Sequence, residues 1–151
     1  MATVEQIHAR LSALINNLSP QARQQLARRI GQQLRKSQQA RIVRQQNPDG
    51  SKYEPRKQQK LRRKKGRIKR KAMFAKLKTA RFLKIRTNAN EAIIGFTGRE
   101  ADIAKIHQYG LQARPTPNAS YKVQYAQREL LGFSREDVEM IEMLVLEQLA
   151  R

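Results

Sequence analysis

The residues best suited to binding chemistry in this sequence are the lysines and arginines between Lys52 and Arg86. That stretch holds seventeen Lys or Arg and a single acid, Glu54, so it carries +16 of the formal net charge of +20. Clustered ammonium and guanidinium groups repel one another unless they face water or an anion such as phosphate. The sequence therefore favours an anionic partner, nucleic acid first, and the plainer alternative is a solvated arm.

The densest part of this stretch is the first candidate site. Its bases are not interleaved with aromatic residues, which suits contact with phosphates and not stacking on bases. Binding to DNA should then be independent of sequence and steeply dependent on salt. The residues assigned to an anionic partner, either DNA or an acidic neighbouring subunit, are Lys60, Arg62, Arg63, Lys64, Lys65, Arg67, Lys69, Arg70 and Lys71.

The second candidate site is the run His107-Gln108-Tyr109-Gly110. Its histidine has no second ligand or nucleophile close by in the sequence, so we interpret it as a structural polar group near the end of a helix. The four residues precede a loop that contains Pro115 and Pro117. We consider them for subunit contact, with a purely structural role as the alternative.

Composition argues against an enzyme. There is no cysteine, hence no disulfide, thiolate nucleophile or zinc ribbon, and two histidines are too few for most zinc sites. Phosphate-loop, dinucleotide-binding, HExxH and GxSxG motifs are all missing. We predict no catalytic residues, no metal and no cofactor. No signal-peptide pattern opens the sequence and no apolar run approaches the ~20 residues of a membrane span, so we expect a soluble protein without a membrane partner.

Two helices are predicted before residue 47. Thr3 and Gln6 have the spacing of a capping box, and Ser19-Pro20 is a strong signal for a second helix that continues to about Gln46. Asn47-Pro48-Asp49-Gly50 has the composition of a turn. We expect the two helices to form an antiparallel hairpin. The first helix presents an apolar stripe of Val4, Ile7, Leu11, Leu14 and Leu18.

The middle of the chain predicts mixed structure. Residues 51–65 lack periodicity and are interpreted as an exposed arm, and helical spacing returns from Gly66. Residues 82–87 and 92–97 are rich in β-branched and aromatic residues and flank a turn, which predicts a β-hairpin. A helix over 99–108 should end at Gly110, and residues 121–125 alternate as a strand that we expect to join the hairpin's sheet.

The last helix is predicted from Ser134 to the end of the chain. Ser134 can cap it, and acids at 136, 137 and 139 suit the positive end of the helix dipole. Residues 129–151 carry a net charge of −4, opposite in sign to the basic stretch. The predicted buried face comprises Val138, Ile141, Leu144, Val145 and Leu149.

These elements predict an α+β fold, in which an N-terminal helical hairpin and a C-terminal helix pack on a small antiparallel β-sheet and a basic arm or helix is inserted. We expect one domain over 1–151. Its segments are a helical hairpin (1–46), a basic arm with a short helix (47–80), a β-hairpin, helix, loop and strand (81–128) and the C-terminal helix (129–151).

Four runs closely resemble one known family. They are LSPQARQQLARRIGQQLRKSQQARI (18–42), QQNPDGSKYEPRK (45–57), IGFTGREADIAKIHQYGL (94–111) and YAQRELLGFSREDVEMIEMLVLEQL (125–149). In this order they are similar to the phage virion morphogenesis family, the tail-completion proteins of P2-like contractile-tailed bacteriophages. The resemblance covers about 18–150. One small departure is the run 126–129, where the family often has a Pro-Ala-Arg-Glu-type run.

The resemblance implies a structural role late in the assembly of the phage tail. Such proteins cap the head-proximal end of the tail and help to join it to the DNA-filled head, within the virion after assembly in the host cytoplasm. Related neck and terminator proteins form rings, commonly of six copies, around the DNA channel. The implied partners are the chain itself, the tail tube and sheath or neck and connector proteins, and packaged DNA met without sequence specificity. The acidic last helix and the basic arm are candidates to meet across subunits.

Two other functions stay open on the sequence. The chain could be a free, sequence-independent nucleic-acid-binding protein that uses residues 52–86, an interpretation that depends on charge alone. It could also be an assembly chaperone that is absent from the finished particle.

Overall fold

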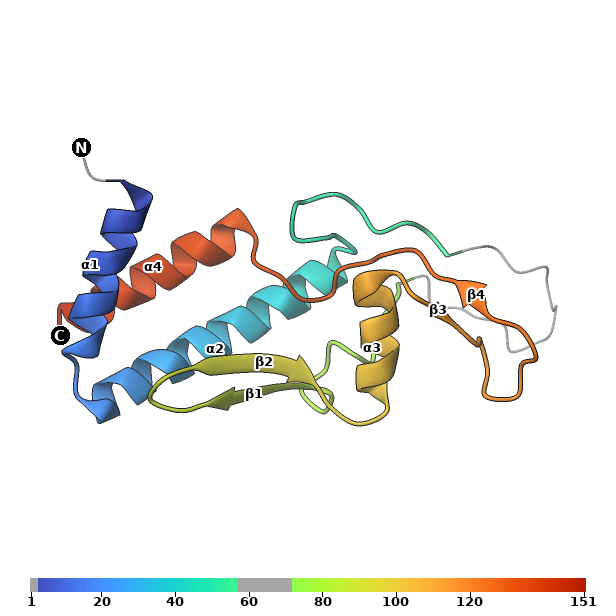
Figure 1. The fold of residues 1–151 in the computed structure, drawn as a ribbon, viewed down its shortest axis with the longest axis horizontal. Helices are drawn as coiled ribbons and strands as arrows, with labels where there is room; N and C mark the ends of the chain where they lie inside the picture. Colours follow the sequence, from blue (N-terminus) through green and yellow to red (C-terminus); the bar gives the residue numbers. More distant parts are fainter. Residues whose placement is uncertain (1–2, 57–71) are drawn as a thin grey trace. The chain divides into compact units, whose positions relative to one another are not determined.

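The computed structural model describes residues 3–56 and 72–151 and confirms the predicted α+β class. Its helices are α1 (Val4–Asn16), α2 (Pro20–Val43), α3 (Glu100–Tyr109) and α4 (Arg135–Leu149) (Figure 1). Its strands are β1 (Leu83–Thr87), β2 (Ala92–Phe96), β3 (Gln112–Ala113) and β4 (Val123–Gln124). β1 pairs with β2, and β3 pairs with β4, in two separate two-stranded sheets.

The chain forms two compact units built from interleaved segments. Unit 1 comprises residues 1–36, 85–94 and 135–151, and unit 2 comprises residues 37–84 and 95–134. Both α2 and the β1–β2 hairpin run from one unit into the other. Residues 57–71, which contain the first candidate site, lie outside the described residues.

The predicted helix starts are confirmed. The hydroxyl of Thr3 accepts a hydrogen bond from Gln6 N at 3.1 Å, and the Gln6 amide oxygen accepts one from Thr3 N at 2.9 Å. Ser19 Oγ accepts from Ala22 N at 3.1 Å and so caps α2. α2 ends at Val43, before the predicted Gln46, because Gln45 adopts a left-handed backbone with φ of 56°.

In unit 1, α2 lies between the hairpin and α4. A Cβ atom on Gly31 would be 2.7 Å from Ile85 Cγ2 and 3.3 Å from Thr87 Cγ2, so the hairpin packs directly on the α2 backbone. Arg29 instead reaches α4, with its guanidinium 2.5 Å from the Glu147 carboxylate. Side chains two residues apart on an α-helix point in directions that differ by about 200° around the helix axis. The hairpin and α4 therefore pack on opposite sides of α2 (Figure 1).

α4 also lies against α1, a contact that the sequence did not predict. The buried face of α4 is rotated about the helix axis relative to the buried face that the sequence predicted. Val145 is buried as expected, but Val138 is 44% exposed, and Asp137 and Gln148 are buried instead. The prediction of Val138 was wrong because positions 137, 141, 145 and 148, three or four residues apart, form the inward stripe.

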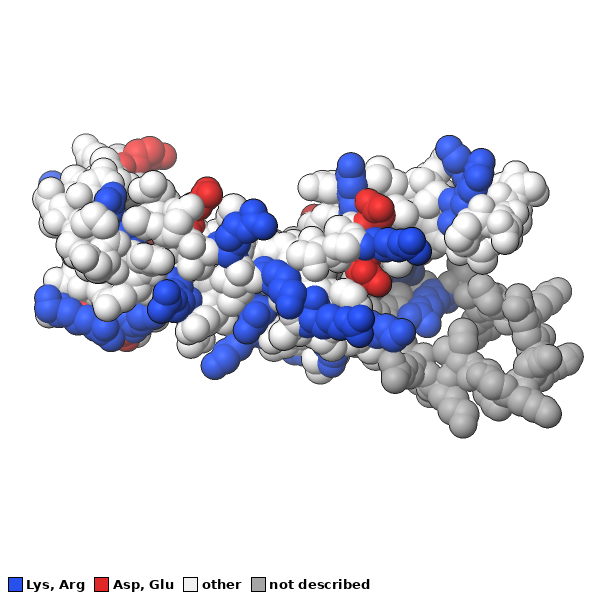
Figure 2. Space-filling view, turned by 90° about the horizontal axis from the view of Figure 1, so that it is seen from below, with Lys and Arg blue, Asp and Glu red and all other residues white. Residues whose placement is uncertain are grey.

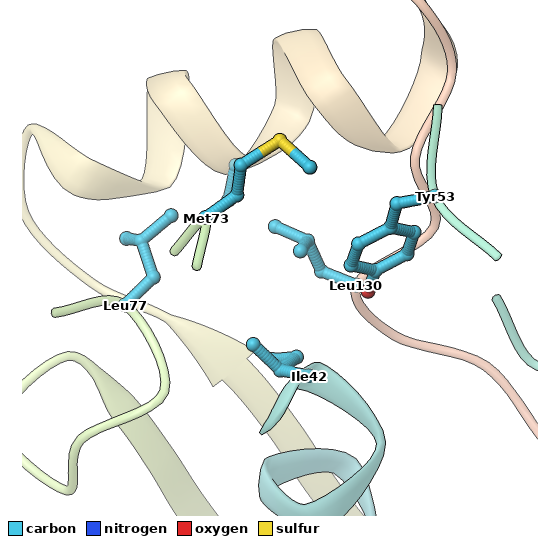
Figure 3. Packing of buried hydrophobic residues seen from close by; sticks show 6 residues of the cluster. Ile42, Tyr53, Met73, Leu77 and Leu130 are labelled. Atoms are coloured by element: carbon cyan, nitrogen blue, oxygen red, sulfur yellow. The ribbon is translucent and has the colours of Figure 1, made fainter. Parts of the chain in front are cut away.

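The core of unit 2 gathers side chains from distant segments. Ile42 at the end of α2, Tyr53, Met73, Leu77 and Leu130 point toward one another (Figure 3). Ala104 of α3 completes the buried cluster, and Phe74 and Phe96 pack against it. Ile42 and Leu130 are among the most completely buried side chains of the described residues.

Two sequence-based expectations in unit 2 are corrected. The basic helix expected from Gly66 does not appear in its described part, where residues 72–82 form successive turns. Phe74 has a left-handed φ of 66°, which is incompatible with a continuing α-helix. The strand expected at 121–125 does not join the hairpin either, because β4 pairs antiparallel with β3, the nearer segment, which was not predicted.

Gly31→Ala should destabilise the protein by about 1 kcal/mol, because the overpacking cost of ~1–3 kcal/mol exceeds the ~1 kcal/mol gained in helix propensity. Urea unfolding measures the difference. Gln32→Ala, on the exposed side of α2, is the matched control. Combining Gly31→Ala with Ile85→Leu, which removes the methyl group at Cγ2, should recover part of the loss. A rise in the unfolding midpoint of Gly31→Ala alone would contradict the close packing.

Candidate functional site

The best-defined candidate site is a junction in unit 2 around the extended segment 127–132, which precedes α4. The side chain of Gln108, in α3, forms hydrogen bonds with the backbone of this segment, as a neighbouring β-strand would. Gln108 Oε1 accepts hydrogen bonds from Leu130 N at 2.9 Å and Leu131 N at 3.0 Å. Gln108 Nε2 donates to the Leu131 carbonyl at 2.8 Å. One amide side chain thus satisfies three backbone groups outside regular secondary structure.

The predicted turn at 47–50 forms and contacts the same segment. Gly50 N donates to the Asn47 carbonyl at 2.9 Å, and the Asn47 side-chain oxygen accepts from Glu129 N at 2.8 Å. A Cβ atom on Gly132 would be 2.5 Å from Pro48 Cγ, so the turn packs against the Gly132 backbone. The turn therefore holds both ends of the run 129–132.

The end of α2 supplies the remaining partners of this run. Gln38 Oε1 accepts from Gly132 N at 3.1 Å. The buried guanidinium of Arg41 donates to Gln38 Oε1 and, at 3.4 Å each, to the carbonyls of Leu130 and Gly132. Two buried polar side chains on one turn of α2 thus position the segment before α4.

Arg128, like Gln38 and Arg41, is a residue of the junction that the sequence did not single out. It is 5% exposed, and its Nε donates to the Glu54 carbonyl at 2.7 Å and its Nη2 to the Pro55 carbonyl at 3.2 Å. Its Nη1 lies 3.3 Å from His107 Nδ1, and its backbone N donates to the His107 carbonyl at 2.7 Å. Burial lowers the pKa of Arg128, and Arg128 ties α3 to the residues that lead into the basic segment.

His107 belongs to an aromatic cluster. Its ring lies edge-on to Phe74, with centroids 4.9 Å apart, and to Tyr125, at 5.2 Å. Burial, helped by the positive charges of Arg128 and Arg56, lowers the pKa of His107 to about 4. The imidazole is therefore neutral at pH 7, which lets Nδ1 accept a hydrogen bond from Arg128. This geometry supports the structural interpretation of His107.

The last two residues of the run 107–110 differ in exposure. Tyr109 is 63% exposed, whereas Gly110 ends α3 with a φ of 64° and leaves no room for a side chain against Gln127. The structure therefore brings His107, Gln108 and Gly110 into intramolecular contacts and presents Tyr109 outward. Subunit contact at this run stays a prediction, and Tyr109 is its accessible member.

Both described ends of the basic segment are fixed in the same core. Tyr53 OH donates to the Glu129 carbonyl at 2.9 Å, and burial raises the pKa of Tyr53 to about 12. On the other side, Gln45 Oε1 accepts from Met73 N at 2.8 Å, and Gln45 Nε2 donates to the Met73 carbonyl at 2.9 Å. The rings of Tyr53 and Phe74 meet edge-on at 5.7 Å. The described residues on both sides of 57–71 are therefore fixed in the same junction.

The described contacts of the junction are intramolecular. In residues 3–56 and 72–151 there is no cluster of three His, Cys, Asp or Glu able to hold a metal ion. Within the same ranges, no helix has the length and apolar character needed to cross a membrane. The polar side chains of the junction bond to backbone groups and to one another, so they hold segments together.

Comparison with known proteins identifies the class to which this chain belongs. The chain is a member of the phage virion morphogenesis family, whose profile matches residues 2–150. It is 47% identical over 143 residues, 94% of each chain, to tail completion protein S of Escherichia phage P2. No solved structure matches it. The resemblance inferred from the sequence runs is thus confirmed.

His107 should make the stability of the protein pH-dependent. Its pKa falls from 6.5 to about 4 on folding, so between these values the unfolded chain binds more protons and stability declines as pH falls. These two pKa values correspond to a loss of roughly 3 kcal/mol from pH 7 to pH 4, which screening by solvent at the partly exposed ring reduces to roughly 2 kcal/mol. His107→Asn, which retains an acceptor for Arg128 but cannot titrate, should remove that part of the pH dependence.

Urea unfolding at several pH values measures this difference, and comparing variants cancels the contribution of the carboxylates that titrate in the same range. His8→Asn, which replaces the exposed histidine of α1, is the control. Parallel pH profiles for the wild type and His107→Asn would show that His107 does not titrate as the junction requires.

Proposed function

We propose that this protein is a structural tail-completion protein, which acts at the head-proximal end of a phage tail and helps to join the tail to the DNA-filled head. The observation that carries the proposal is its 47% identity, over 94% of both chains, to a protein named for tail completion. Coverage of nearly the full length of both chains argues that the two proteins share one architecture. The role is non-enzymatic, and its place is the tail–neck region of the virion, with assembly in the host cytoplasm.

The proposed assembly is a ring of copies, six if it matches the tail tube, around the channel through which DNA passes. A net charge of +20 suits a subunit that borders DNA. The bases assigned to an anionic partner, Lys60 to Lys71, lie outside the described residues, but both flanks of that segment are fixed in the junction of unit 2.

Complementation tests this role. A phage P2 derivative that cannot make tail completion protein S should regain infectious particles, at least in part, in cells that produce this chain. Mass spectrometry of the purified particles should detect the chain. Leu130→Asp, which places a charge in the core of unit 2, is the negative control. Restored particles that lack the chain would favour the assembly chaperone, and neither rescue nor incorporation would contradict the proposal.

A second candidate function, sequence-independent nucleic-acid binding through residues 52–86, is favoured by the charge of that stretch. Fluorescence anisotropy with two unrelated DNA duplexes, at two salt concentrations, distinguishes this candidate function from tail completion. A free DNA-binding protein should bind both duplexes equally at physiological salt. Its log affinity should fall with log salt with a slope of about −0.9 per phosphate contacted. Absence of binding near physiological salt, together with incorporation into particles, would exclude this alternative.

A further inference from the structure

The outward face of α4 carries apolar and acidic side chains without a covering element in the described structure. Val138, Met143 and Leu146 are 44%, 60% and 56% exposed, respectively. Glu139 and Glu142 lie on the same side of the helix, between these apolar residues. Exposed apolar residues clustered on one helix face are typical of a protein–protein contact. Glu139 forms an ion pair with Arg135 of the same helix at 3.4 Å, so Glu142 is the acid of this face that a basic partner would complement. We call these five residues the α4 face.

The β1–β2 hairpin has an outward face of the opposite sign. Along β1, Leu83, Ile85 and Thr87 are buried or half-buried, whereas Lys84 and Arg86 are exposed. On β2, Ile93 is 45% exposed. Figure 2 shows more Lys and Arg than Asp and Glu side chains among the described residues seen from below. We call Arg86 and Ile93, both in unit 1, the hairpin face; it pairs an apolar residue with a base, and the only acid of the hairpin turn is Glu91.

These two faces point in opposite directions within unit 1. The hairpin packs on α2 through Gly31, and α4 packs on the other side of α2 through Arg29. The inward sides of both elements are occupied by α2, so their outward sides look away from each other. A protein with complementary surfaces on opposite sides can bind copies of itself head to tail, and such contacts generate rings or filaments.

We propose that the α4 face of one copy binds the hairpin face of the next. This proposal rests on the ring of the proposed function and names the surfaces that would build it. A second copy is the favoured occupant because the two faces complement each other in charge, acid against base, and each has an apolar centre. Their lengths also agree, since a 15-residue helix spans about 22 Å and a 5-residue strand about 17 Å.

The size of these faces predicts how strong the contact is. A stable interface buries roughly 800 Å² per partner, which is more than one helix face and a short hairpin provide. Two isolated copies should therefore associate weakly, and closure of the ring on a tail should stabilise the assembly. The experiment has to examine assembled tails as well as the concentrated protein.

Cysteine crosslinking tests the contact directly, because the natural chain contains no cysteine. A chain with both Ile93→Cys and Leu146→Cys should form a ladder of covalent multimers on mild oxidation, in concentrated protein and in purified tails. The two positions lie on opposite sides of α2, so they cannot link within one chain. Either single variant should give no product larger than a dimer.

Charge exchange in the double-cysteine chain provides the second readout. Arg86→Glu and Glu142→Arg should each reduce the ladder several-fold, and the two together should restore it. Arg114→Glu and Asp102→Lys, which change exposed residues of unit 2, are the matched controls and should leave the ladder unchanged.

Three results would overturn the proposal. One is the absence of a ladder in tails that contain the protein. Another is efficient covalent dimers from a single-cysteine variant, which would indicate a symmetric contact. A third is an Arg86→Glu variant that loses affinity for duplex DNA but keeps the ladder, which would assign the hairpin face to DNA. The proposed tail-completion role is judged separately, by incorporation of the cysteine-free protein into particles.

Discussion

The structure of unit 2 depends on how the backbone of residues 127–132 finds its hydrogen-bond partners. This segment belongs to no helix or sheet, yet Leu130 is fully buried, and buried backbone groups without partners are costly. Side chains provide the partners: Gln108 from α3, Gln38 and Arg41 from α2, and Asn47 from the turn. The segment can therefore be buried only when three distant parts of the chain are already in place.

The need of residues 127–132 for hydrogen-bond partners explains why three sequence runs that look unrelated occur together in this chain. The turn at 47–50, the run at 107–110 and the run at 129–132 have no common chemistry when considered separately. In the structure they meet at one junction, where the first two provide the bonds that the third needs. Arg128 extends the junction to Glu54 and Pro55, so the basic segment begins at the same place. Each of the four runs that carry the resemblance to the family thus contributes residues to this junction in unit 2.

Local signals in the sequence predicted local structure well. Capping residues, the 47–50 turn and the left-handed Gly110 each act within a few residues, and all are found. The errors concern long-range packing: the partner of β4, the rotation of α4 that exposes Val138, and the left-handed Phe74 held between two rings. Arg128 was missed for the same reason, since a lone arginine before two leucines gives no sign that it will be buried among backbone carbonyls.

The distribution of charge over the two units has a consequence for assembly. Half of the chain's twelve acids lie in residues 129–151, and most of these are on α4 in unit 1, whereas the ends of the basic segment are fixed in unit 2. If acids and bases were mixed on one surface, their fields would cancel and neither would guide a partner. Here α4 packs with α1 and α2, which leaves Glu142 on its outward side next to the ion pair of Arg135 and Glu139. If the proposed contact between copies forms through unit 1, it leaves the bases of residues 52–86 to an anionic partner. The two proposals, self-association and contact with DNA, are then compatible in one strongly basic chain.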